Sequence, residues 1–134
     1  MVINLEKSEV VIAKILSLLL EWGIQETQLE FQELELDDSF APFFFPCAEW
    51  LEAEGIIRFS NLQRFQDSIA SGRVARPVLT ASGFATLGKS ISVNGQTETL
   101  SEGVNKISAS ESSLWQVGDA IGGILGGLTK SMGS

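Results

Sequence analysis

Apolar side chains near the start of the chain recur with the period of a helix. In "SEVVIAKILSLLLEWG", residues 8–23, they fall on one broad face and are Val11, Ile12, Ile15, Leu18, Leu19 and Trp22. A repeat of three or four residues is typical of an amphipathic helix. Ser8 is placed to cap the start of this helix and Gly23 to end it, so we expect a core helix here.

Three short segments have the pattern or composition of strands. Residues 27–36, "TQLEFQELEL", alternate Leu29 and Phe31 with polar side chains, which predicts a short strand or an extended entry. Residues 56–62, "IIRFSNL", and residues 74–80, "VARPVLT", are rich in β-branched and aromatic side chains. A polar excursion separates the last two, as in a hairpin.

A helical stretch is predicted between the first strand and the second. In "DDSFAPFFFPCAEWLEAEG" it starts at Asp38 or Ser39. Pro42 suits a first turn, and Pro46 starts or kinks a second helix, because proline lacks the N–H that a helix interior needs. Gly55 ends this second helix.

Two small elements follow the predicted hairpin. Residues 80–90, "TASGFATLGKS", predict a short helix with Thr80 as its N-cap. Residues 90–100 carry Asn94 and Gly95, which favour a two-residue turn, so we expect a small hairpin or an extended link there.

The end of the chain, about residues 112–132, predicts a glycine-rich amphipathic helix. Its apolar positions step by three and four residues, as in the seam between two packed helices, and are Leu114, Val117, Ile121, Ile124 and Leu128. Gly118, Gly122 and Gly126 share a face beside this seam, where missing side chains let another backbone approach closely. Each glycine costs a helix about 1 kcal/mol in water, so this helix needs a surface to pack on.

The sequence leaves that surface open. It is the protein's own domain, a second copy of the chain, a membrane surface, or a partner on which a flexible tail becomes ordered. The uncharged run from Ala120 to Thr129 is too short for a transmembrane helix, which takes about 20 residues. Interfacial helices carry a basic polar face, and here only Lys130 supplies one. We expect contact with a membrane surface at most, and no span.

Charge divides the chain into an acidic first part and a mildly basic middle. Its 134 residues include 17 acids and 9 bases, for a net charge of −8. Residues 1–54 hold two lysines against twelve acids, whereas residues 55–89 hold five bases against Asp67. The net charge opposes nonspecific binding to nucleic acid and anionic lipid, and it favours basic protein partners. The division of charge allows internal pairing, head-to-tail self-association or presentation of the acidic face to a partner. The alternative is a solvated acidic surface with no specific partner.

Residue types in short supply restrict the chemistry. The chain has no histidine and one cysteine, Cys47, which excludes an imidazole base, an intramolecular disulfide and a Cys/His zinc site. The acids of residues 33–38 form a run, which is typical of a solvated face rather than of metal ligands. We therefore expect no enzyme activity, no cofactor and no metal. Charged residues interrupt the apolar run at the N-terminus, so we expect no signal peptide and a cytoplasmic protein.

The order of these elements, with two short phrases, resembles the winged helix-turn-helix superfamily over about residues 8–90. The phrases are "WLEAEGIIRF", in which a helix end leads into the first wing strand, and "LTASGFATLGK", in which the second strand leads into a further helix. The resemblance implies a winged-helix fold. It leaves function open, because such domains serve both as DNA readers and as protein-interaction modules.

DNA binding fits this chain poorly. The stretch matching the superfamily's DNA-reading helix, residues 40–54, has three glutamates and no lysine or arginine, so it would repel a duplex. The wing offers a positive stripe of Arg58, Arg64, Arg73 and Arg76. We expect these arginines to be solvated or paired with the protein's own acids, and nucleic-acid contact through them is the lesser alternative.

The aromatic run Phe43, Phe44 and Phe45 lies close to Trp50. Successive residues of a helix point about 100° apart, so three phenylalanines cannot all face one core. Either the C-terminal helix covers the surplus ring, or that ring is an anchor in a partner interface, where aromatic residues concentrate binding energy. Cys47 is expected to be a small buried hydrophobe in the same region.

We therefore expect an α+β, mainly helical fold, with a winged-helix-like domain over residues 1–90. An extension over residues 91–134 holds a hairpin or linker and the glycine-rich helix. The expected function is non-enzymatic binding and neutralisation of a basic protein, in the manner of an immunity protein or antitoxin. Alternatives are a DNA-associated regulator that uses the basic wing and a membrane-surface factor that uses the C-terminal helix. The expected contact residues are Phe43, Phe44, Phe45, Trp50, Trp115, Gly118, Gly122 and Gly126.

Overall fold

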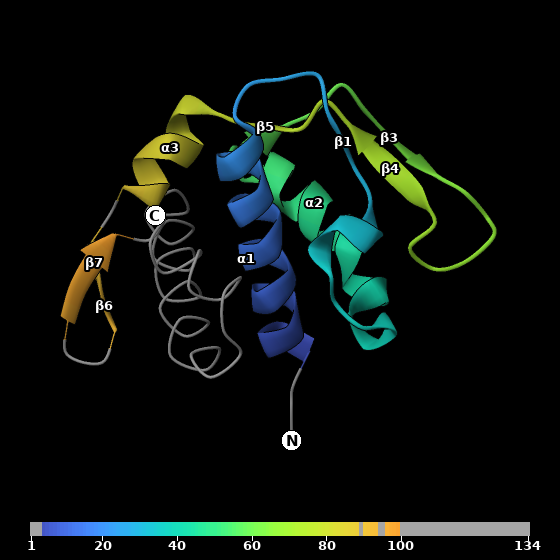
Figure 1. The fold of residues 1–134 in the computed structure, drawn as a ribbon, viewed down its shortest axis with the longest axis horizontal. Coiled ribbons are helices and arrows are strands. Elements are labelled where there is room, and N and C mark those ends of the chain that lie inside the picture. The colour runs from blue at the N-terminus through green and yellow to red at the C-terminus, as the bar shows by residue number, and fades with distance from the viewer. Residues whose placement is uncertain (1–3, 89, 94–95, 100–134) are drawn as a thin grey trace.

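The computed structural model describes residues 4–88, 90–93 and 96–99, which form an α+β fold that is mainly helical (Figure 1). Its helical elements are α1 (Asn4–Trp22), η1 (Phe31–Leu34), η2 (Asp38–Phe43), α2 (Phe44–Ala53) and α3 (Ala81–Leu87), where η marks a 3₁₀ helix. Its strands are β1 (Gln28–Leu29), β2 (Ile57–Arg58), β3 (Asn61–Arg64), β4 (Gly72–Ala75), β5 (Val78–Leu79), β6 (Ser90–Val93) and β7 (Gln96–Thr99). The predicted fold class is confirmed. Within these ranges no helix has the length and apolar character to cross a bilayer.

The first helix is the predicted core helix, but it starts earlier than expected. Ser8 lies inside α1, where its hydroxyl donates to the carbonyl oxygen of Asn4 at 2.9 Å, so it does not cap the helix. The predicted end is confirmed at Gly23, which has a φ of +68° and donates its N–H to the carbonyl oxygen of Leu19 at 3.0 Å. Such a φ is the usual way for glycine to end a helix.

Beyond α1, the segment predicted to be one short strand divides into two elements. Only Gln28 and Leu29 pair as β1, and the chain then turns into η1. Phe31 and Leu34 are both buried, and a spacing of three residues is the repeat of a 3₁₀ helix rather than of a strand. Glu35 ends η1 with a φ of 56°. The strand prediction therefore holds only for Gln28 and Leu29, although the alternation of buried and exposed residues continues to Phe31.

The helical stretch that follows changes type in the middle of the aromatic run. Asp37 caps η2 by accepting a hydrogen bond from the N–H of Ser39 at 2.9 Å, which agrees with the predicted start at Asp38. Phe43 ends η2, and α2 begins at Phe44, before Pro46. Pro46 lies in the first turn of α2, where a missing N–H costs little.

The predicted strands 56–62 and 74–80 form one long antiparallel hairpin. Ile57 pairs with Leu79 in β2–β5, and Asn61 pairs with Ala75 in β3–β4, in the same register. The pairing is interrupted at Arg76, whose N–H donates instead to the carbonyl oxygen of Thr27 at 2.8 Å, and at the following proline, which has no N–H. β1 pairs with β4, so the three-stranded sheet has the order β1-β4-β3.

Gly72 lets this hairpin lie close to α2. Its φ is +134°, and a Cβ atom there would collide with the carbonyl oxygen of Gln63 and lie 2.9 Å from Cζ of Phe45. A side chain at this position would therefore force β4 away from both β3 and α2.

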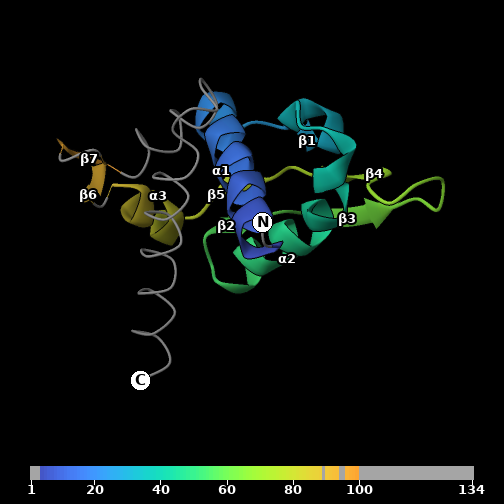
Figure 2. The ribbon, with the colours of Figure 1, turned by 90° about the horizontal axis from the view of Figure 1, so that it is seen from below.

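The core lies between α1, α2 and the strands. In both views α3 lies on one side of α1, and α2 with the β3–β4 hairpin lies on the other (Figures 1 and 2). The largest fully buried side chains come from the helical elements α1, η1, α2 and α3, from β1, and from β2 with the residue before it. They are Ile15, Leu16, Leu19, Leu29, Leu34, Phe44, Phe45, Leu51, Ile56, Ile57 and Leu87.

Two predictions for the later part of the chain are confirmed. Thr80 caps α3, because its hydroxyl accepts a hydrogen bond from the N–H of Gly83 at 2.9 Å. β6 and β7 form an antiparallel pair, the small hairpin predicted on either side of Asn94 and Gly95. That turn and the predicted glycine-rich helix, with Trp115, Gly118, Gly122 and Gly126, lie outside the described residues.

Candidate protein-interaction surface

The predicted aromatic anchors are partly core residues. Phe44 and Phe45 are 0% and 2% exposed, and their ring centroids lie 4.8 Å apart. Phe44 also makes an edge contact with the ring of Phe31 at 5.9 Å. The expectation that Phe44 and Phe45 contact a partner is therefore wrong. Phe43 and Trp50 pack against the core but are only partly buried.

The β3–β4 hairpin covers the buried ring of Phe45. The guanidinium of Arg64 lies 4.9 Å from the centroid of Phe45, and Gly72 lies against the same ring. Nη2 of Arg64 also pairs with Oε1 of Glu49 on α2 at 2.6 Å. Phe45 is therefore covered by the hairpin, whereas Phe43 is the ring of the run that stays partly exposed. The C-terminal helix that was expected to cover the surplus ring lies outside the described residues.

The remaining arginines of the predicted stripe have different surroundings. Arg58 is exposed, and Nη2 of Arg76 lies 3.5 Å from Oε1 of Glu26. The expectation of solvated or acid-paired arginines is confirmed for these two and for Arg64. Arg73 differs, because it donates to the amide oxygen of Gln28 at 2.9 Å.

Arg73 belongs to β4 and is held between two neutral groups. Besides its hydrogen bond to Gln28, its guanidinium lies 5.4 Å from the ring centroid of Phe65. A cation over an aromatic face is attracted by the ring quadrupole. The guanidinium is therefore held against the hairpin by two contacts within the domain.

An acidic segment occupies the surface beside β1. We use this name for Glu30, Glu33, Glu35, Asp37 and Asp38, all of which are exposed. Across residues 4–88, no salt bridge joins one of these five carboxylates to a lysine or an arginine. The ion pairs of the hairpin arginines lie elsewhere, on Glu49 and Glu26.

Within the acidic segment, Asp37 is stabilised in its charged form by its own turn. The carboxylate of Asp37 accepts hydrogen bonds from the hydroxyl and the N–H of Ser39, and these lower the pKa of Asp37 below its ordinary value of 3.8. A weaker contribution comes from the positive charge of Lys7. Lys7 itself lies 5.5 Å from the ring centroid of Phe40.

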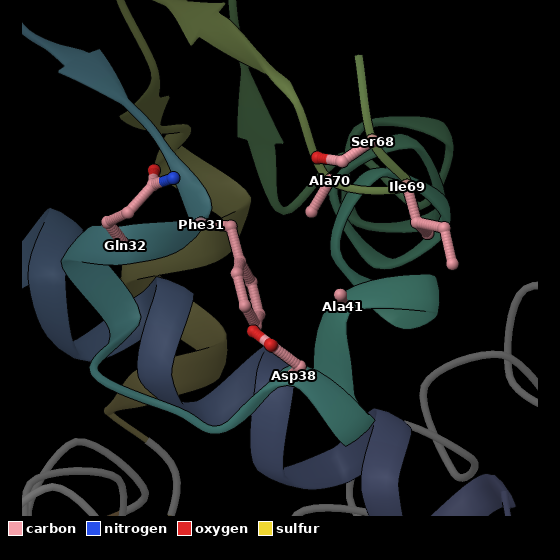
Figure 3. A pocket seen from close by; sticks show the side chains of 7 residues that line it. All are labelled: Phe31, Gln32, Asp38, Ala41, Ser68, Ile69 and Ala70. Carbon is pink, nitrogen blue, oxygen red and sulfur yellow. The ribbon is translucent and has the colours of Figure 1, made fainter. Parts of the chain in front are cut away.

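A hollow separates this acidic segment from the loop of the β3–β4 hairpin. Its volume is about 360 Å³, and it is lined by Phe31, Gln32, Asp38, Ala41, Ser68, Ile69 and Ala70. Figure 3 shows the ring of Phe31 on one side of the space and Ala41 and Ala70 on the other, with Asp38 between them at one end. Ile69 is 70% exposed at this edge of the domain.

Sequence reasoning missed this hollow, since its two walls are distant in the chain. The one local signal was Ile69, an isolated aliphatic residue in the polar loop "FQDSIASG". Exposed apolar side chains are common singly, so this signal had little weight before the opposite wall was known.

The described residues offer few groups for metal binding or nucleophilic attack. They contain no group of three or more histidine, cysteine, aspartate or glutamate side chains placed to hold a metal ion. Cys47 is 5% exposed, as predicted, and burial raises the pKa of its thiol from 9.0 to about 11. A neutral buried thiol is a poor nucleophile.

Comparisons of the chain with protein-family models, with curated proteins and with solved structures returned no match. The function of the protein is therefore inferred from the surface described above. Its distinctive parts are the acidic segment, the hollow beside it and the hairpin arginines.

Proposed function

We propose that the protein is a non-enzymatic, cytoplasmic protein-interaction module that binds a basic partner through its acidic segment. The observation that carries this proposal is the set of five exposed carboxylates at residues 30–38, none of which forms a salt bridge with a lysine or arginine of residues 4–88. A patch of one sign raises the rate of encounter with an oppositely charged surface and disfavours partners of like charge.

The net charge of −8 extends this preference to the whole chain. Binding that covers a functional surface of a basic protein would neutralise it, in the manner of an immunity protein or antitoxin. Because exposed charges are screened over about 8–10 Å at physiological salt, association of this kind weakens steeply as salt is raised.

The test is affinity capture from native lysate with the full chain as bait, at low salt and at about 300 mM salt. We expect basic proteins to be retained at low salt and released at high salt. A bait with Glu30→Gln and Glu33→Gln should retain less, because it removes two charges of the acidic segment.

The matched control bait carries Glu21→Gln and Glu52→Gln, which remove two exposed charges outside the acidic segment. It should behave like the unchanged chain. Retention of no basic protein at low salt, or equal losses from both variant baits, would count against the proposal.

A second candidate is a winged-helix, DNA-associated regulator. It is favoured by the sheet order β1-β4-β3 and by the arginines of the hairpin, which would serve as the wing. Against it, α2 exposes Glu49 and Glu52 and has no cation, and Arg64 is engaged by Glu49. A duplex shift at low salt that is lost in Arg58→Ala with Arg73→Ala would favour this candidate over protein binding.

A further inference from the structure

The hollow beside the acidic segment combines an apolar lining with a charged rim. Phe31 and Ala70 are 7% and 8% exposed, and Ala41 is partly buried, so the floor and walls are largely hydrocarbon. Gln32, Asp38 and Ser68 are exposed and supply polar atoms at the edge. This arrangement, an apolar pocket with a few polar groups, is typical of sites that hold one side chain of a partner.

The size of the hollow restricts its occupant. A volume of about 360 Å³ lies at the lower end of the range for ligand pockets, about 300–1,000 Å³. A small aliphatic side chain fits this space better than a folded element does. Ile69 is 70% exposed at the mouth of the hollow, where it offers further apolar surface to the bound side chain.

The negative charge at the rim restricts which residues of the partner can lie on either side of the inserted aliphatic side chain. Asp38 lines the hollow, and Glu33 and Asp37 are the chain neighbours of the lining residues Gln32 and Asp38. Lys7 is the cation whose charge acts on Asp37, and it lies against the ring of Phe40. Lysine or arginine next to the buried side chain would therefore meet carboxylates, whereas acidic neighbours would be repelled.

We propose that this hollow is the specificity pocket for the partner: it takes one aliphatic side chain from a segment that has lysine or arginine on both sides of it. This inference rests on the proposed function and adds to it the kind of sequence that is bound. The carboxylates supply the part of the affinity that depends on salt, and the hollow supplies a part that does not, because burial of apolar area is not screened.

The test uses two fluorescein-labelled peptides of equal charge. One has a central leucine with three lysines on each side, and the other has serine in place of leucine. Binding to the full chain is followed by fluorescence anisotropy at low salt. We expect the leucine peptide to bind about tenfold more tightly, because burial of a leucine side chain is worth roughly one factor of ten or more.

Two variants locate the preference. Ala41→Trp fills the hollow and should reduce the ratio of the two affinities to about one, while binding of the serine peptide persists. Ile69→Ser removes apolar surface from a side chain that is already 70% exposed, so it should lower the ratio without disturbing the core, whether or not Ala41→Trp folds. Ala85→Trp, at an exposed alanine of α3, is the matched control and should leave the ratio unchanged.

The outcomes distinguish failure of the specificity pocket alone from failure of the proposed function on which it rests. Equal affinity of the unchanged chain for both peptides overturns the specificity pocket and leaves the acidic segment as a binding site. A preference for leucine that survives both Ala41→Trp and Ile69→Ser also overturns it. Failure of both peptides to bind at low salt overturns both proposals.

Discussion

The thiol of Cys47 lies against the N-terminal half of α1, with its sulfur 3.6 Å from the carbonyl oxygen of Ser8. Burial raises the pKa of this thiol to about 11, from the ordinary value of 9.0. The native protein therefore keeps a proton that the unfolded chain releases above pH 9. The contribution of this group to stability is complete below about pH 9 and is lost as the pH rises to about 11.

The first prediction is that Cys47 reacts slowly in the native protein. At pH 8 we expect a thiol reagent to label it at least about a hundredfold more slowly than it labels the chain in denaturant, since both thiolate and access are scarce. The chain has one cysteine, so the unfolded protein is its own control. Complete labelling of the native protein at the rate seen in denaturant would contradict the buried position.

At single positions, prediction succeeded where the cause was local. Thr80 and Gly23 were identified because a cap and a helix end depend on a few neighbouring residues. The cover of Phe45 was not predictable, because it comes from Arg64 and Gly72 through the pairing of β3 with β4. Local periodicity carries no information about which distant element covers a ring.

Among the elements, α3 is fixed to the rest of the domain by close contact at Gly83. A Cβ atom on Gly83 would collide with the carbonyl oxygen of Ile56 and lie 3.4 Å from Cδ2 of Leu79. The hydroxyl of Thr80 reinforces the same junction by donating to the carbonyl oxygens of Gly55 and Ile56. The junction thus depends on one residue without a side chain and one with a hydroxyl.

We therefore expect Gly83→Ala to lower the free energy of unfolding by about 1–3 kcal/mol, the usual cost of overpacking. Gly88→Ala is the matched control, because a Cβ atom there would meet its nearest neighbours, carbonyl oxygens of Ala85 and Phe84, at an ordinary 3.6 Å. It should change stability by less than about 0.5 kcal/mol. Urea unfolding of both variants measures the difference, and equal stabilities would show that α3 does not pack as described.

Elements with a long period were predictable, and short ones were not. α1 was found from its repeat alone, although its start was placed too late. β1 and η1 were merged into one strand, because two residues of strand and one turn of 3₁₀ helix are too short to show a period. Glu30, Glu33 and Glu35 of the acidic segment lie in this merged region, so their charge could be read from the sequence although their conformation could not.

On the scale of the whole molecule, like charges crowd one part of the surface. The chain carries a net charge of −8, and the acidic segment concentrates five carboxylates in residues 30–38. The ion pairs of Arg64 and Arg76 are more than half exposed and contribute little to stability. We therefore expect repulsion among the carboxylates to destabilise the fold by more than these two ion pairs stabilise it.

The prediction is that the melting temperature rises when neutral salt is increased from about 10 mM to about 200 mM, because the Debye length shortens from about 30 Å to below 10 Å. The variant with Glu30→Gln and Glu33→Gln should melt higher at low salt and respond less to salt. Calorimetry of both proteins gives the comparison. A melting temperature that falls with salt would mean that attractive pairs dominate instead.

The candidate site was also only partly predictable from the sequence. Its charge was visible in the sequence, since counting acids needs no structure. Its hollow could not be read from the sequence, since Phe31 and Ala41 line it together with residues 68–70, which are distant in the chain and come near only in the folded domain. The predicted contact residues Phe44 and Phe45 were wrong for a related reason, because the hairpin buries one of them.

The pairing of β1 with β4 also sets an order of events during synthesis. Gln28 is translated well before its partner Ala75, whereas the two arms of the hairpin are translated close together. Local pairs close faster than distant ones, so β3 and β4 are expected to join first and β1 to dock later. Until residue 75 is translated, the nascent chain holds the apolar face of α1 without the sheet that completes its core, and chaperones have this interval in which to bind it.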